Sequence, residues 1–141
     1  MILLIIVLLL IDRISKLLVN GINVKIIDKF LYFHYAENTG IAFSMFRDNN
    51  LLIILLTIFI IGCIIFYVIR NKPKKKIHII GYSLLLAGAI GNFLDRIIYG
   101  YVIDFIDVYI FGYDYPIFNL ADSFIVVGII LLLLGGRYDN N

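Results

Sequence analysis

Four long apolar stretches alternate with more polar segments along the chain. Each stretch is close in length to the about 20 residues that an α-helix needs to cross the hydrocarbon core of a bilayer. The pattern therefore predicts an all-α integral membrane protein with four transmembrane helices in a single domain covering residues 1–141. The predicted spans are residues 1–19, 51–69, 77–98 and 118–134.

A cleaved signal peptide is the alternative interpretation of residues 1–19. No basic residue precedes the apolar run, and no cleavage site of the A-x-A kind follows it. We therefore interpret this segment as the first helix.

The composition supports a membrane protein. Hydrophobic residues make up 62% of the chain and charged residues 16%, against roughly 45–50% and about 25% in soluble domains. A water-soluble monomer is excluded. Cys63 is the single cysteine, so no internal disulfide can form, and with only two histidines a His/Cys metal site is not expected. No cofactor is expected either.

The basic residues predict the orientation. Residues 70–76 contain five of the twelve basic residues and no acid, and short cytoplasmic loops are rich in Lys and Arg. This loop and both termini are then cytoplasmic, and residues 20–50 and 99–117 face outward. A patch that binds nucleic acid or lipid is the alternative, but we expect no nucleic-acid partner.

The outward segments are aromatic. They hold seven of the ten tyrosines, and amphipathic rings favour the headgroup level of the outer leaflet. Residues 25–35 are rich in β-forming side chains, which predicts a small extracytoplasmic β-rich segment between the first two helices. The phenylalanines among these tyrosines are Phe30, Phe33, Phe43, Phe46, Phe105 and Phe111.

Polar residues inside two of the spans suggest packing roles. Asp12 and Lys16 are four residues apart and share a helix face, which favours an internal acid–base pair over a direct chemical role. Asn92, Asp95 and Arg96 share a face at the outer end of the third span. We expect an Asp95–Arg96 ion pair, with the remaining donors of Arg96 free to contact a ligand.

Two acids have no basic neighbour in sequence. They are Asp104, inside an apolar stretch, and Asp122, near the outer end of the fourth span. An unpaired acid in apolar surroundings is costly, which favours a functional role. Asn119 can cap the fourth helix or bond to the Asp122 carboxylate. If both carboxyls share a site, one can act as a general base while the other stays protonated, as in aspartic proteases.

Five motifs in order resemble those of lipoprotein signal peptidases (signal peptidase II), the bacterial membrane aspartyl proteases that remove the signal peptide from prolipoproteins whose cysteine has been lipidated. The similarity extends over nearly the whole chain. One departure is Ala87, where relatives often have Gly. The motifs are Asp12-x-x-Ser15-Lys16, Asn38-Thr39-Gly40-Ile41-Ala42-Phe43, Gly88-Ala89-Ile90-Gly91-Asn92-x-x-Asp95-Arg96, Val102-Ile103-Asp104-Phe105 and Phe118-Asn119-Leu120-Ala121-Asp122-Ser123.

The resemblance implies that Asp104 and Asp122 form the catalytic dyad. It implies cleavage before a diacylglyceryl-modified cysteine at the outer membrane interface, with prolipoproteins and membrane lipid as partners, and we expect a monomer. The residues implied to position substrate or dyad, or to support them, are Asn38, Gly40, Asn92, Arg96, Asn119, Asp12, Lys16 and Asp95.

Three other classes fit the sequence less well. A proton- or cation-coupled transporter would need acids near the midplane, and only Asp12 is near that depth. A purely structural four-helix protein gives no reason to place Asp104 and Asp122 at one interface. A serine protease lacks a G-x-S-x-G motif, and Ser15 and Lys16 lie on different helix faces.

Overall fold

The computed structural model describes residues 1–40 and 49–136. In these residues four helices overlap the four apolar stretches, and four strands form one antiparallel sheet. Phe43, Phe46 and the Ile41-Ala42-Phe43 part of one motif lie outside the described residues. The elements are α1 (Ile2–Leu18), β1 (Asn23–Ile27), β2 (Leu31–Asn38), α2 (Asn50–Asn71), α3 (Lys76–Tyr99), β3 (Val102–Ile110), β4 (Tyr113–Asp114) and α4 (Leu120–Leu134).

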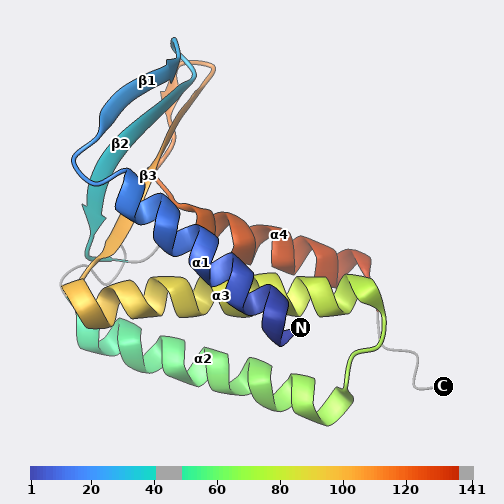
Figure 1. Ribbon diagram of the computed structural model, residues 1–141. Coiled ribbons are helices and arrows are strands. Elements are labelled where there is room, and N and C mark those ends of the chain that lie inside the picture. Colours follow the sequence, from blue (N-terminus) through green and yellow to red (C-terminus); the bar gives the residue numbers. More distant parts are fainter. Residues whose placement is uncertain (41–48, 137–141) are drawn as a thin grey trace.

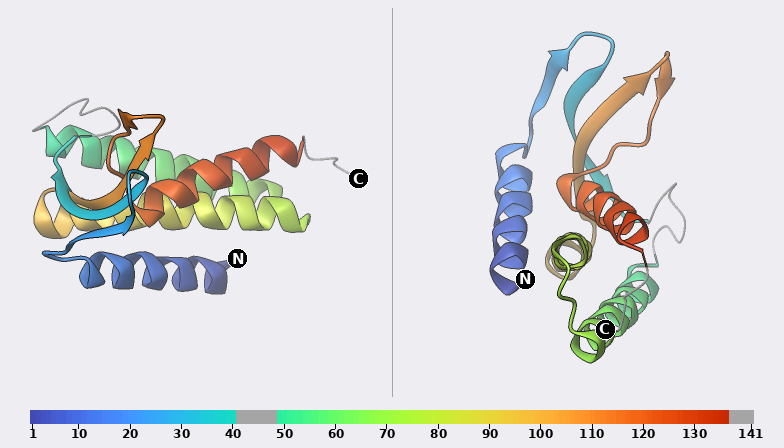
Figure 2. Two further views of the ribbon diagram at one scale, coloured as in Figure 1. Left: turned by 90° about the horizontal axis from the view of Figure 1, so that it is seen from above. Right: turned by 90° about the vertical axis from the view of Figure 1, so that its right-hand side faces the viewer.

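Helix α3 is the centre of the helical part. It contacts α1, α2 and α4, and Figure 2 shows it between the other three. Small residues allow this packing. A Cβ at Gly88 would overlap the backbone carbonyl of Ala121, and a Cβ at Gly128 would lie 2.8 Å from the carbonyl oxygen of Gly81. Glycines at these crossings let the backbones of α3 and α4 approach each other closely.

The sheet is larger than the predicted β-rich segment. Its strand order is β1-β2-β3-β4, so the second outward segment contributes half of its strands. The prediction of an all-α protein with β structure only between the first two helices is therefore incomplete. Residues 102–110 are rich in β-branched and aromatic side chains, which suit a strand. Their partner is distant in sequence, with Ala36 of β2 opposite Asp104 of β3.

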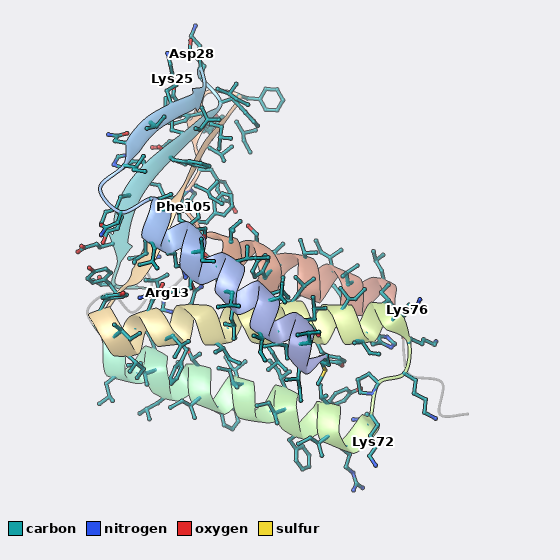
Figure 3. The ribbon with its side chains drawn as sticks, in the orientation of Figure 1. Arg13, Lys25, Asp28, Lys72, Lys76 and Phe105 are labelled. Carbon is teal, nitrogen blue, oxygen red and sulfur yellow. The ribbon has the colours of Figure 1, made fainter. Side chains whose placement is uncertain are left out.

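The sheet lies at one end of the helices. It meets the C-terminal ends of α1 and α3 and the N-terminal end of α4, and the strands rise away from the helix axes (Figure 1). The basic loop lies at the opposite end, where Figure 3 labels Lys72 and Lys76. The molecule therefore has one end built from aromatic strands and another that is basic.

Among the residues that the structure describes, two helices are long and apolar enough to cross a membrane, namely α2 with 22 residues and α3 with 24. Helix α4 is a shorter apolar helix of 15 residues, and α1 has 17 residues, of which Asp12, Arg13 and Lys16 are charged. Most of α2 exposes large apolar side chains. These surfaces suit contact with lipid better than contact with water.

Candidate active site

A cleft of about 540 Å³ lies where α2, α3 and α4 meet β3. Its walls inside the helical part are apolar, with side chains such as Ile60, Leu85 and Ile129. At the end next to the sheet it becomes polar. The polar side chains that line this end include Asn38, Asn92, Arg96, Asp104 and Asp122, which are five of the residues that the sequence singled out.

Strand β3 places Asp104 in the polar end of the cleft with only 2% of its surface exposed. Two amide groups hold its carboxylate. Asn38 Nδ2 donates to Asp104 Oδ2 at 2.9 Å, and Asn119 Nδ2 donates to Asp104 Oδ1 at 2.6 Å. Burial raises the pKa of Asp104, and the charge of Asp122 raises it further, to about 7, against the opposing effect of the two amides.

Asp122 is fixed by the start of α4. Asn119 is the N-cap, and its Oδ1 accepts a hydrogen bond from the Asp122 backbone N–H at 2.9 Å. In return, Asp122 Oδ2 accepts from the Asn119 backbone N–H at 3.2 Å, which completes a capping box. Asn92 Nδ2 donates to the other oxygen, Asp122 Oδ1, at 2.7 Å. Asn119 thus both caps the helix and bonds to the carboxylate.

Asn119 joins the two acids. Its side chain contacts Asp104, and its backbone contacts Asp122. Among the described residues, no Lys, Arg or His nitrogen lies within 4 Å of an oxygen of either carboxylate. Two carboxyls in one cleft without a cationic partner can share a proton, because ionising both would place like charges together away from water.

Arg96 lines the same end of the cleft but is not paired with Asp95. Its Nη2 donates to the backbone oxygen of Gly40 at 2.8 Å, and Asn38 Oδ1 accepts from the Gly40 backbone N–H at 2.9 Å. The buried Arg96 Nε has no hydrogen-bond partner among the described residues. Asn38 and Arg96 therefore fix the chain at Gly40.

The predicted Asp95–Arg96 ion pair is wrong. Asp95 bonds instead to residues of α1, with Lys16 Nζ at 2.8 Å and Arg13 Nη1 at 3.1 Å. Adjacent side chains on a helix point in directions about 100° apart, so Asp95 faces α1 while Arg96 faces the cleft. Arg13 was not identified from the sequence as a partner of Asp95. Its position in an apolar span was a usable signal, because a cation there needs an acidic partner.

The predicted Asp12–Lys16 pair is confirmed, with 2.9 Å between Lys16 Nζ and Asp12 Oδ2. Lys16 is fully buried. Asp12 Oδ1 also accepts from the backbone N–H of Ala121 at 3.0 Å, so the pair ties α1 to the start of α4. Asp12, Lys16 and Asp95 form a buried ionic cluster on a different face of α3 from the cleft.

Comparisons with known proteins agree with the motifs. The family model described as signal peptidase (SPase) II matches residues 4–136. A lipoprotein signal peptidase of Clostridium novyi is 42% identical over 129 residues, which cover 87% of each chain. One from Staphylococcus carnosus is 39% identical over 127 residues, covering 90% of this chain and 80% of the relative.

Solved structures show the same fold. A bacterial membrane enzyme superposes with a TM-score of 0.88 at 34% identity, covering 95% of this chain and 85% of the other. A second bacterial membrane enzyme gives 0.86 at 33% identity, covering 99% and 93%.

Proposed function

Because the chain belongs to the signal peptidase II family, we propose that it removes the signal peptide of prolipoproteins by cleaving before a diacylglyceryl-modified cysteine, with Asp104 and Asp122 as its catalytic dyad. By family the chain is an aspartic endopeptidase. The observation that carries the assignment of the dyad is the joint placement of two carboxyls without a cationic partner in the polar end of the cleft.

The mechanism uses the dyad in its singly protonated form. The ionised carboxylate removes a proton from a water molecule, whose oxygen attacks the scissile carbonyl carbon. The protonated carboxyl donates to the carbonyl oxygen and stabilises the tetrahedral intermediate. When the C–N bond breaks, the leaving nitrogen takes up a proton from the dyad. The pKa of Asp104, raised to about 7, supports a shared proton at neutral pH.

We place all four helices across the bacterial inner membrane, with both termini and the basic loop in the cytoplasm. The polar end of the cleft adjoins the sheet, and the basic residues lie at the other end (Figures 1 and 3). The positive-inside bias then puts the sheet and the dyad outside. Exposed aromatic side chains of the sheet, including Phe111 and Tyr113, suit the headgroup level.

The cleft suits a substrate that is partly lipid. Its apolar walls continue from the dyad into the helical part, where an apolar peptide segment or acyl chains can lie. At the polar end, Asn38 and Arg96 are placed to hold the peptide backbone or the ester groups near the modified cysteine. The proposed partners are lipidated prolipoprotein and membrane lipid, for a monomer that does not bind nucleic acid.

The strongest test of the proposed function compares a lipidated precursor with its unlipidated form. Two acyl chains carry a membrane affinity of ~0.8 kcal/mol per buried CH₂ and hold the scissile bond at headgroup depth. We expect purified protein in lipid to cleave a diacylglyceryl-modified precursor, and to cleave the unlipidated precursor very poorly. The measurement is kcat/KM for both forms of one precursor. Equal values for the two forms would contradict recognition of the lipid.

Two variants serve as a matched pair in the same assay. Arg96→Ala removes a guanidinium that lines the cleft, and Lys74→Ala removes a cation at the opposite end of the molecule. Arg96→Ala should lower kcat/KM on lipidated precursor, and Lys74→Ala should leave it near the parent value. Equal effects of the two would remove Arg96 from substrate handling.

A further inference from the structure

Lys16 is a buried cation that does not line the cleft. It nevertheless donates a hydrogen bond to Asn92, the residue that holds Asp122. Its ammonium group has three donors and no acceptor. They meet three acceptors, which are Asp12 Oδ2 at 2.9 Å, Asp95 Oδ2 at 2.8 Å and Asn92 Oδ1 at 3.1 Å. Asn92 is the residue that lines the cleft and holds Asp122.

Lys16 and Asn119 together determine which way the Asn92 amide faces. Since an ammonium can only donate, the oxygen of the amide must point to Lys16 and its NH₂ must point away. Asn92 Oδ1 also accepts from Asn119 Nδ2 at 3.1 Å, so both of its lone pairs are used. The NH₂ group then faces Asp122 and donates to Oδ1 at 2.7 Å.

We propose that Lys16 is a positioning residue for the dyad, which fixes the Asn92 amide so that its NH₂ group holds Asp122 Oδ1. The inference rests on the proposed function, because it assumes that Asp122 is catalytic. Asp122 Oδ2 is held separately by the Asn119 backbone N–H. The contact from Asn92 is therefore the second of two that set the plane of the Asp122 carboxylate.

Without Lys16, the oxygen of the Asn92 amide keeps only the donor from Asn119, so the amide is held less firmly and can turn over. A turned amide would place its carbonyl oxygen against an oxygen of Asp122, and two acceptors facing each other cannot bond. The carboxylate would then keep only the backbone contact. Because misplacement by about 1 Å can cost ~10²-fold in rate, the loss should appear in kcat. Lys16 does not line the cleft, so KM should change little.

Removing Lys16 alone would leave Asp12 and Asp95 buried with one cation fewer, and we expect this loss to destabilise the protein whatever happens at the dyad. The double variant Asp12→Asn/Lys16→Met removes one acid together with the cation and keeps the Arg13–Asp95 pair. Arg13→Met is the matched control, because it also removes a cation from Asp95 but does not touch Asn92. Each variant is purified in lipid and assayed on lipidated precursor.

We expect kcat about 10- to 100-fold below the parent value in Asp12→Asn/Lys16→Met, with KM within about threefold. Arg13→Met should keep kcat near the parent value per folded molecule. Adding Asn92→Ala to the double variant should cause no further loss in kcat beyond Asn92→Ala alone, because both changes remove one contact.

Two results would overturn the proposal. One is a folded double variant with kcat within twofold of the parent, and the other is a kcat loss that multiplies with that of Asn92→Ala. Failure of the proposed function would look different, because the parent protein itself would then not cleave the lipidated precursor.

Discussion

The buried acids fall into two groups on different faces of α3. Asp12 and Asp95 each touch the ammonium of Lys16, and Asp95 also touches Arg13. Asp104 and Asp122 are instead held by amide and backbone N–H groups alone among the described residues. In the first group Lys16 and Arg13 balance the charges of the two acids, whereas in the second the acids line the cleft without a cationic partner among the described residues.

This difference separates a structural from a chemical use of the same side chain. A carboxylate bound to a cation has its charge balanced by that cation. A carboxylate bound only by neutral donors, beside a second acid, retains a proton that it can give or take. Lys16 links the two groups indirectly, since its third donor reaches Asn92, which in turn donates to Asp122. The ionic group thereby also supports the geometry of the reactive one.

We expect the largest effect on activity when either proposed catalytic acid is neutralised. Asp104→Asn and Asp122→Asn each remove one carboxyl with little change in shape, so we expect kcat to fall by about 10⁴-fold or more. The double variant should be no worse than the singles, because groups that act as one unit are not additive. Cleavage of lipidated precursor by purified, folded variants measures this.

Far-UV circular dichroism and membrane insertion of the two variants control for folding. Near-normal turnover in either single variant would end the assignment of the dyad.

The sequence was informative where the cause of the structure is local. The helices could be predicted because each apolar stretch carries its own length signal, and the Asp12–Lys16 pair because i and i+4 side chains meet on any helix. The same logic found Asn119 at the start of α4, since an N-cap is read from neighbouring positions.

The sequence was less informative where the partner is distant. The pairing of β2 with β3 brings Ala36 opposite Asp104, and no local pattern specifies that register. The partners of Asp95 lie on α1, so the neighbouring Arg96 was the wrong choice. The placement of Asp104 and Asp122 in one cleft likewise depends on packing between distant segments.

Removing an acid of the ionic group should damage stability more than chemistry. Asp95→Ala leaves Lys16 buried with one acidic partner and removes the acceptor of Arg13. Breaking a buried ion pair in this way costs about 3–5 kcal/mol. Thermal unfolding in detergent should show a clear loss. Asp28→Ala is the matched control, because its pair with Lys25 is exposed at the tip of the sheet (Figure 3) and should matter little.

Equal unfolding temperatures for Asp95→Ala and Asp28→Ala would contradict a structural role for the ionic group.

The smallest effect we expect is a shift in the pH dependence of cleavage, which reports on the proton of the dyad. The pKa of Asp104 is raised to about 7, first by burial and then by the charge of Asp122. The singly protonated dyad is the active form, so kcat/KM should fall as pH rises through about 7 and the shared proton is lost.

Asn38 Nδ2 donates to Asp104 Oδ2 and favours the ionised form. Asn38→Ala should therefore let the dyad hold its proton to higher pH and move the alkaline limb upward by about one pH unit or less. Glu37→Gln is the control on the same strand. The Glu37 carboxylate accepts a hydrogen bond from Tyr35 and none from Asn38, so the alkaline limb of this variant should stay in place. The pH at the midpoint of the limb is measured independently of the maximal kcat/KM. A change in titration can therefore be told apart from a loss of substrate contact. A limb that stays fixed in Asn38→Ala, or moves to lower pH, would show that this amide does not control the proton of the dyad.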